Sequence, residues 1–144
     1  MASEDTLIGN DFRFQIGNGA SPEVFTDMCA VVEASGIGEE SPLIDVTSLC
    51  DLARTYRRGL PDGLEFPLVV NYIVGDEQSH TLYNAFKSKT VINFRLSVAD
   101  ASPPEFIEFA AIIRGWNVQA PSGEKGTMTF TLKTTGEVVW TFAA

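Results

Sequence analysis

Histidine and cysteine are scarce in this sequence. It contains one histidine, His80, and two cysteines, Cys29 and Cys50, among 144 residues. No second histidine is present to complete a zinc site or a general-base pair, and the two cysteines lack the C-x-x-C spacing of a metal or redox motif. Two cysteines are also too few for a disulfide scaffold. We therefore expect no metal, no cofactor and no catalytic residues.

Long apolar runs and nucleotide-binding motifs are missing as well. No run of about 18 apolar residues is present to span a membrane. Residues 1–5 are acidic, where a secretory signal would begin with positive charge. The glycine pairs at 17–19 and 36–38 lack the helix and lysine that phosphate binding needs. We expect a protein made and kept in a cytoplasm, with no membrane contact.

Positive charge is also in short supply. Nineteen acidic residues against ten basic ones give a formal net charge of −9, and this charge repels the phosphates of nucleic acids. The one basic cluster consists of Arg54, Arg57 and Arg58 around Tyr56. Such a cluster can stack on nucleic acid, but in so acidic a chain it favours contact with an acidic protein surface.

Alternating apolar residues are what the sequence does contain. The hydrophobic content of 44% is enough for the core of one domain spanning residues 1–144. Residues 24–34 fit a helix or a strand, and we favour a strand because Gly36 and Gly38 follow closely. The clearest strand is 64–74, and further strands are predicted at 12–16, 43–47, 91–98, 105–116, 127–133 and, after a turn at Thr135-Gly136, 138–142.

One segment has helical periodicity. Between Glu77 and Lys87, the apolar residues Leu82, Tyr83 and Phe86 share one face. Acids stand at the front of this segment and lysines at its back, which suits the helix dipole. The elements together predict a mainly β fold, an antiparallel β sandwich or barrel with one flanking α-helix.

Two further segments do not fit the core pattern. Residues 1–10 form a mostly polar N-terminal arm with the apolar pair Leu7-Ile8, which can order only against another surface. Residues 36–63 are rich in glycine, proline, serine and charge and predict a long loop. A loop of this length in a small domain is usually functional or disordered.

Several segments follow one another in a recognisable order and spacing. They are VFTDMCAVV (24–32), LIDVTSLCD (43–51), RRGLPDG (57–63), EFPL (65–68), GDEQ (75–78) with the helix after it, the stretches 106–116 and 126–133, and the pair Thr135-Gly136. In this order and spacing the chain resembles the tail tube proteins of lambda-type siphophages, the bacteriophages with long non-contractile tails. The resemblance covers nearly the whole chain and rests on no single motif.

This resemblance implies a fold shared with the tube of type VI secretion systems. It implies six copies in a ring and rings stacked into a hollow tube, through which DNA is ejected into the host without specific binding. The implied partners are further copies of the chain, the tape measure protein, and tail-tip and terminator proteins. The implied location is the virion tail, after assembly in the host cytoplasm. These 144 residues leave no room for the immunoglobulin-like domain of the lambda protein, so we expect an undecorated tube.

In that family, sheets of neighbouring subunits join to line the channel, while the arm and the long loop clasp adjacent subunits and rings. The negative charge of the chain suits a channel wall that repels DNA, although the charge alone favours ordinary solubility as its explanation. The residues of this sequence that we expect at subunit interfaces lie in the arm and the loop: Leu7, Ile8, Glu39, Glu40, Arg54, Tyr56, Arg57 and Arg58.

Three other interpretations remain open at the level of sequence. Alternating strands also suit a monomeric β-barrel carrier that holds a small apolar ligand inside. The tube can belong to a related injection particle instead of a phage. A hydrolase that uses His80 with Asp76 or Glu77 is a weaker alternative, since no motif supports it.

Overall fold

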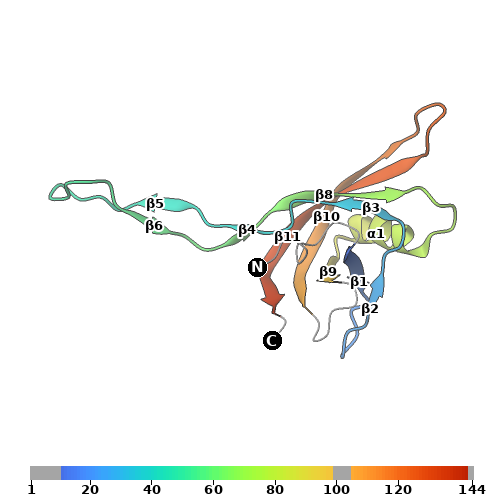
Figure 1. Ribbon diagram of the computed structural model, residues 1–144, viewed down its shortest axis with the longest axis horizontal. Helices are drawn as coiled ribbons and strands as arrows, with labels where there is room; N and C mark the ends of the chain where they lie inside the picture. Colours follow the sequence, from blue (N-terminus) through green and yellow to red (C-terminus); the bar gives the residue numbers. More distant parts are fainter. Residues whose placement is uncertain (1–10, 99–104, 143–144) are drawn as a thin grey trace.

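The computed structural model describes residues 11–98 and 105–142 (Figure 1). The N-terminal arm at residues 1–10, with Leu7 and Ile8, lies outside the described residues. The predicted fold class is confirmed: the chain is mainly β, every strand pairing in it is antiparallel, and one helix flanks the main sheet. Among the described residues, no helix has both the length and the apolar character needed to cross a bilayer.

A seven-stranded sheet forms the body, in the order β2-β1-β9-β10-β11-β8-β3. Two short ribbons, β4-β7 and β5-β6, lie outside it. The elements are β1 (Phe12–Gly17), β2 (Phe25–Asp27), β3 (Val31–Ala34), β4 (Glu39–Glu40), β5 (Leu43–Asp45), β6 (Tyr56–Arg58), β7 (Asp62–Gly63), β8 (Glu65–Asn71), α1 (Glu77–Ser88), β9 (Val91–Val98), β10 (Phe106–Gln119) and β11 (Thr127–Thr141).

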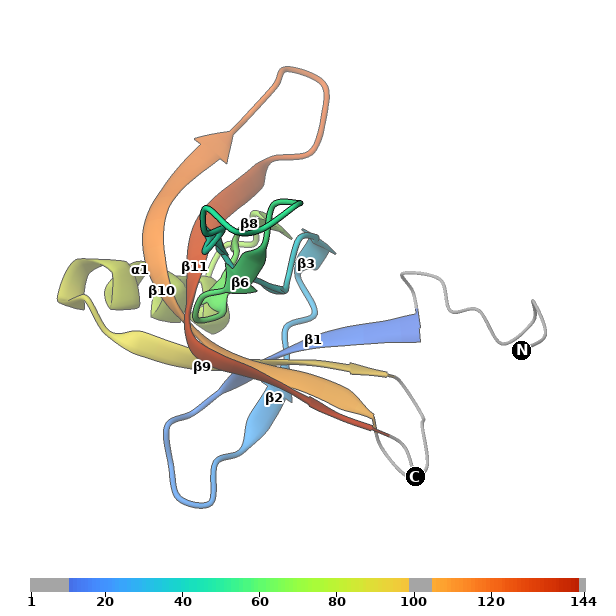
Figure 2. The ribbon, with the colours of Figure 1, turned by 90° about the vertical axis from the view of Figure 1, so that its left-hand side faces the viewer.

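The long strands β10 and β11 run through both halves of this curved sheet (Figure 2). The first part of β10 pairs with β9, whereas the first part of β11 pairs with β8. The concave face buries side chains from strands of both halves, which bear the period-2 pattern seen in the sequence. The core consists of Phe14, Ile16, Met28, Ala30, Phe66, Leu68, Val70, Leu82, Ala85, Ile92, Phe94, Phe109, Ala111, Ile113, Phe130 and Leu132.

Helix α1 closes one end of this core. Leu82 and Ala85 are buried in the core, and the Tyr83 ring meets the Trp116 ring of β10 edge to face at 5.5 Å between centroids. The helix ends at Lys89, whose φ of 60° puts it in the left-handed conformation that often follows a last helical turn. The predicted helix is thus confirmed, and it is held by its apolar face.

The predicted strand over residues 24–34 is two strands. β2 pairs with β1 at one edge of the sheet and β3 pairs with β8 at the other edge. Between them the chain crosses the open side of the sheet, where the Met28 amide donates to the Phe14 carbonyl at 2.9 Å. Met28 and Ala30 are buried during this crossing. One continuous strand is impossible here because its two halves serve opposite edges.

The predicted turn at Thr135-Gly136 is a bulge inside the single strand β11. Opposite the β10 residues Glu108 and Ala110 lie Val139 and Thr135, so β11 uses more residues than β10 over the same length. Gly136 has a φ of +78°, which suits the extra residues of a bulge. The strand bends at this point and continues.

The predicted loop at residues 36–63 is a long two-stranded hairpin that projects from the body (Figure 1). We call residues 36–63 the hairpin, β4 and β7 its base, and residues 46–55 its tip. Between the two short ribbons, the Gly59 amide donates to the Pro42 carbonyl at 2.8 Å. Beyond them, the Val46 amide donates to the Thr55 carbonyl at 2.9 Å. The segment therefore has a defined extended shape.

Candidate functional site

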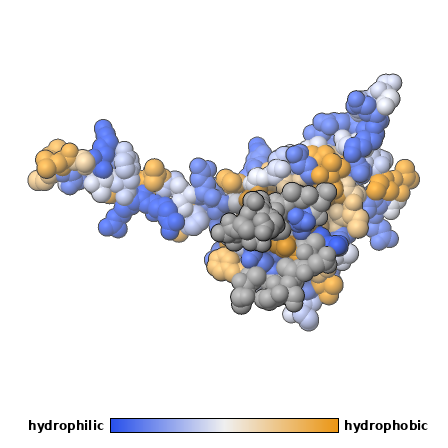
Figure 3. Space-filling model, in the orientation of Figure 1, coloured by the Kyte–Doolittle hydropathy of each residue, from blue (hydrophilic) through white to orange (hydrophobic). Residues whose placement is uncertain are grey.

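The hairpin exposes apolar side chains along its length. Every residue from 42 to 58 is exposed. At the tip, Leu49 and Leu52 have the full exposure of an isolated side chain, and Figure 3 shows this apolar end (orange) beyond a stretch of polar residues. A two-stranded hairpin alone is only marginally stable in water. The other large apolar side chains that it exposes are Leu43, Ile44, Val46, Tyr56 and Leu60.

Polar contacts give the tip its shape. The Thr47 amide donates to Asp45 at 2.9 Å, and the Ser48 amide donates to Asp51 at 2.8 Å. Hydrogen bonds from Thr47, together with the nearby Arg54, lower the pKa of the Asp45 carboxyl from its ordinary value. Asp45 therefore stays ionised at neutral pH and holds the two sides of the tip together.

The basic cluster predicted from the sequence lies on the hairpin but does not act as one patch. Arg54 pairs with Asp45 of its own chain at 2.9 Å. In the ribbon β5-β6, Tyr56 faces Asp45 and Arg57 faces Ile44 across the strands. Because side chains of a strand alternate between faces, Arg57 points away from Tyr56 and Arg58. The arginine-tyrosine stack considered above is therefore split between the two faces of the hairpin.

The two predicted glutamates lie at the hairpin base and have different surroundings. Glu39 accepts a hydrogen bond from the Val138 amide of β11 at 3.4 Å, so it contacts its own body. Glu40 is exposed, opposite Asp62 in the base ladder. The other base strand, β7, is contacted by Lys133 of β11. The Lys133 ammonium donates to Asp62 at 3.1 Å and to the Gly63 carbonyl. Lys133 could not be singled out from the sequence, because its contact residues are 70 and 71 positions away.

Two long strand edges in the body have no partner among the described strands. One is residues 113–119 of β10, beyond its pairing with β9, and the other is residues 135–141 of β11, beyond its pairing with β8. Open edges favour pairing with another chain. The exposed apolar residues beside these edges are Trp116, Val118, Val139, Trp140 and Phe142.

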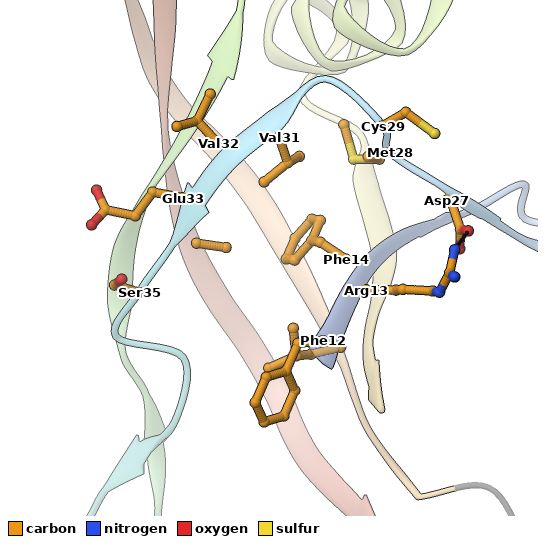
Figure 4. A pocket seen from close by; sticks show the side chains of 12 residues that line it. Phe12, Arg13, Phe14, Asp27, Met28, Cys29, Val31, Val32, Glu33 and Ser35 are labelled. Atoms are coloured by element: carbon orange, nitrogen blue, oxygen red, sulfur yellow. Dashed lines mark hydrogen bonds and ion pairs between the residues drawn. The ribbon is translucent and has the colours of Figure 1, made fainter. Parts of the chain in front are cut away.

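A groove separates the start of β1 from the edge strand β3 (Figure 4). Phe12, Phe14 and Val31 contribute apolar side chains to it. At its rim, Asp27 accepts hydrogen bonds from Gln15 at 2.7 Å and from Arg13 at 2.8 Å. These two hydrogen bonds hold the pKa of the Asp27 carboxyl below its ordinary value, and the bond from Gln15 has the larger effect. The ion pair between Arg13 and Asp27 links β1 to β2 beside this groove.

The side chains that are capable of catalysis or metal binding are scattered over the molecule. His80 is exposed on α1, and the side chain of Asp76 beside it accepts a hydrogen bond from Ser79 at 2.7 Å. Cys29 and Cys50 are free and both exposed, Cys29 on the body and Cys50 at the hairpin tip. In the described part of the chain, no three histidine, cysteine or acidic side chains come together as a metal site. The exposed surfaces of the hairpin and sheet edges are thus the features to explain.

Comparisons with known proteins find this fold in assembled particles. No family model and no curated protein matches the sequence. A chain of the virion of a gene transfer agent is 13% identical, with a TM-score of 0.74 over 95% of this chain and 100% of that chain. The SPP1 tail tube protein is 11% identical, with a TM-score of 0.73 over 94% of this chain and 78% of that chain.

A chain from the sheath/tube terminator of an extracellular contractile injection system has the same fold. It is 11% identical, with a TM-score of 0.76 over 98% of this chain and 100% of that chain. At such low identity the likeness establishes a shared fold. It extends over nearly the whole of this chain.

Proposed function

We propose that this chain is a structural subunit of a phage tail tube. Copies associate into hexameric rings, and the rings stack into a hollow tube that conducts DNA into the host. The observation that carries the proposal is a compact body from which a hairpin projects with its apolar side chains exposed to water. The shared fold with the SPP1 tail tube and the gene transfer agent chain supports it.

Each open surface receives a role in this proposal. The edges at 113–119 and 135–141, with the outer edge of β3, join neighbouring copies by strand pairing within a ring. The hairpin reaches the adjacent ring and buries Leu49 and Leu52 there. The arm at residues 1–10 adds a second clasp. In this arrangement the hairpin and the sheet edges of one copy contact different surfaces on its neighbours. Head-to-tail contacts of this kind can close a ring.

The wider setting follows the same family resemblance. The subunit acts in the virion tail after assembly in the host cytoplasm, with the tape measure protein inside the growing tube and tail-tip and terminator proteins at its ends. It acts as a structural component and uses no cofactor. The net charge of −9 keeps the channel wall from binding the phosphates of the passing DNA.

A tube subunit of a related injection particle is the second candidate, and the fold of the injection-system terminator favours it. The two candidates differ in what the particle carries. Purified particles that protect DNA from nuclease support the phage or gene-transfer role, and particles without DNA support the injection role. The lambda-type assignment is part of the first candidate.

A monomeric carrier of a small apolar ligand fits the interior poorly. The rings of Phe14, Phe94 and Phe109 from one half of the sheet pack together with centroids 5.4 to 6.3 Å apart. Phe66 from the other half meets Phe109 at 5.7 Å and Phe14 at 6.5 Å. Sedimentation velocity over a range of protein concentrations separates the proposals. A tube subunit forms large species above a threshold concentration, whereas a carrier stays one small species throughout.

A further inference from the structure

The hairpin base is fastened to β11 at two points. On one side of the β11 bulge, the Lys133 ammonium donates to Asp62 at 3.1 Å and to the Gly63 carbonyl, and both acceptors belong to β7. On the other side of the bulge, the Val138 amide donates to Glu39 of β4. Each strand of the hairpin base therefore has its own attachment, and the exposed bulge lies between them.

Close backbone packing supports these attachments. The Leu64 amide donates to the Gly38 carbonyl at 2.9 Å, and the Thr134 amide donates to the Leu64 carbonyl at 3.2 Å. A β-carbon on Gly63 would lie 2.5 Å from the Thr134 β-carbon, closer than real atoms approach, and Thr134 itself is buried. The hairpin base thus sits directly against β11 with no room for a side chain between them.

The two attachments, which we call the joint, lie where the strand pairing of β11 changes. Up to Lys133, β11 pairs with β8. From residue 135 onward the same side of β11 has no strand partner within the described ranges. The joint therefore lies where the paired part of β11 gives way to its open edge. The direction of the hairpin and the direction of that edge are set by the same few residues.

We infer that Lys133 and Glu39 are positioning residues that fix the angle between the hairpin and the open edge of β11. A hairpin extends at most about 3.3–3.6 Å per residue, so a small change of angle at the base moves the tip by many ångströms. With the angle fixed, one copy presents its hairpin and its sheet edge in a single geometry. The importance of this angle for assembly rests on the proposed function, but the fixed angle itself does not.

The weakness of surface ion pairs does not oppose this role. The side chains of Lys133 and Asp62 are 33% and 75% exposed, and an ion pair with this exposure contributes little to folding stability. A positioning role requires only that the bonds disfavour other angles. Removing them is therefore expected to leave the melting temperature of the body nearly unchanged while the hairpin gains freedom.

The two native cysteines allow a direct test on dilute monomer. Cys29 lies on the body and Cys50 at the tip, and both are exposed and free. Spin labels on these thiols report the distribution of body-to-tip distances by pulsed electron paramagnetic resonance. The unmodified chain is expected to give one narrow distribution. The double variant Lys133→Met with Glu39→Met is expected to give a broad one, with circular dichroism and melting temperature as checks of the fold.

Matched variants separate positioning from loss of charge. Lys125→Met and Glu40→Met remove the same charges at exposed positions outside the two attachments, and the narrow distribution should remain. Glu39→Gln keeps an acceptor oxygen for the Val138 amide and should also keep it. The single variant Asp62→Asn, at a highly exposed carboxyl, should broaden the distribution less than the double variant does.

Two results overturn the inference. One is a broad distribution for the unmodified chain, and the other is a double variant whose distribution stays as narrow as that of the unmodified chain. Assembly is measured separately, by pelleting of concentrated protein. If the unmodified monomer has a narrow distribution but never assembles, the fixed angle stands and the proposed function fails. If the double variant has a broad distribution yet assembles normally, the positioning role in assembly is refuted.

Discussion

The body and the hairpin place the same residue types in opposite environments. Leu68 and Leu132 in the body are 0% exposed, whereas Leu49 and Leu52 at the hairpin tip are as exposed as isolated side chains. The body holds its shape by burying apolar area. The hairpin holds its shape by ladder bonds and polar contacts and leaves its apolar area for another surface. One region is stabilised by burial, and the proposed function assigns the other to contacts between copies.

The largest effect expected from this contrast is on folding. Truncation of Phe130→Ala, a fully buried ring of the body, should lower the free energy of unfolding by about 3–5 kcal/mol because it removes apolar contacts and leaves a cavity. Denaturant unfolding followed by circular dichroism measures this loss. The comparison variant Leu52→Ala in the hairpin should change the same free energy by less than about 0.5 kcal/mol. Similar losses in both variants would remove the distinction between the regions.

Deletion of residues 1–10 should separate folding from assembly. The described residues supply a core that spans both halves of the sheet and the helix, so the shortened chain should remain a folded monomer with a normal circular dichroism spectrum. Tubes should be absent, because the arm is proposed to clasp neighbouring copies. Electron microscopy of the concentrated variant checks this expectation. Normal tubes would show that the arm has no role in assembly.

Replacement of the tip leucines should act on assembly alone. Burial of one leucine side chain stabilises an interface by about 1.5–3 kcal/mol, and each 1.4 kcal/mol is about a tenfold change in an association constant. The double variant Leu49→Ser with Leu52→Ser should therefore raise the threshold concentration for assembly by one or more orders of magnitude. Light scattering measures the threshold. Ala53→Ser, in the same tip, is the control and should leave it in place.

Reversal of the hairpin arginines should weaken assembly less. Arg54, Arg57 and Arg58 changed together to Glu remove the positive charge of the hairpin, and we expect its acidic partner surface to repel the variant. The effect should be larger at low salt, where screening is weak. Pelleting assays over a series of salt concentrations test it. Equal assembly at every salt concentration would mean that the arginines meet no acidic surface.

The smallest effect concerns pH and the edge strand β2. The Asp27 carboxyl has a pKa lowered from 3.8 by Gln15 and Arg13, so its contribution to stability is present above that pH and is lost as the pH falls through the lowered pKa. Because the pair is partly exposed, Asp27→Asn should cost only about 0.2–1 kcal/mol at pH 7. Urea unfolding at pH 7 and pH 2 should show the difference at pH 7 and a smaller difference at pH 2.

The body was predictable from sequence because one of its faces is buried. Alternation predicted β9 to the residue and β8 with an end three residues too late, and the helix showed its apolar face through Leu82 and Phe86. The hairpin was predicted as a loop, since both of its faces are exposed and no alternation marks it. The pairing of Leu43 with Arg58 has no local signature. The bulge at Gly136 was mistaken for a turn because the same residue types serve both structures.

The interface role of the candidate residues stays a prediction, and their geometry could not be predicted from the sequence. The segment that carries Arg54 to Arg58 is indeed the most exposed part of the described chain, but only the register of β5 and β6 shows that Arg57 and Arg58 face opposite ways. The contact between Glu39 and Val138 joins residues 99 positions apart. Long-range contacts of this kind depend on the complete fold, so a single sequence gives no access to them.

Negative-stain electron microscopy of the concentrated, unmodified protein tests the central claim most directly. A tube subunit should give hollow rings or tubes of uniform diameter, with sixfold symmetry in averaged end views. Elongated hollow particles that disappear in the Leu49→Ser, Leu52→Ser variant would tie the tube to the hairpin. A field of single small particles at every concentration would contradict the account.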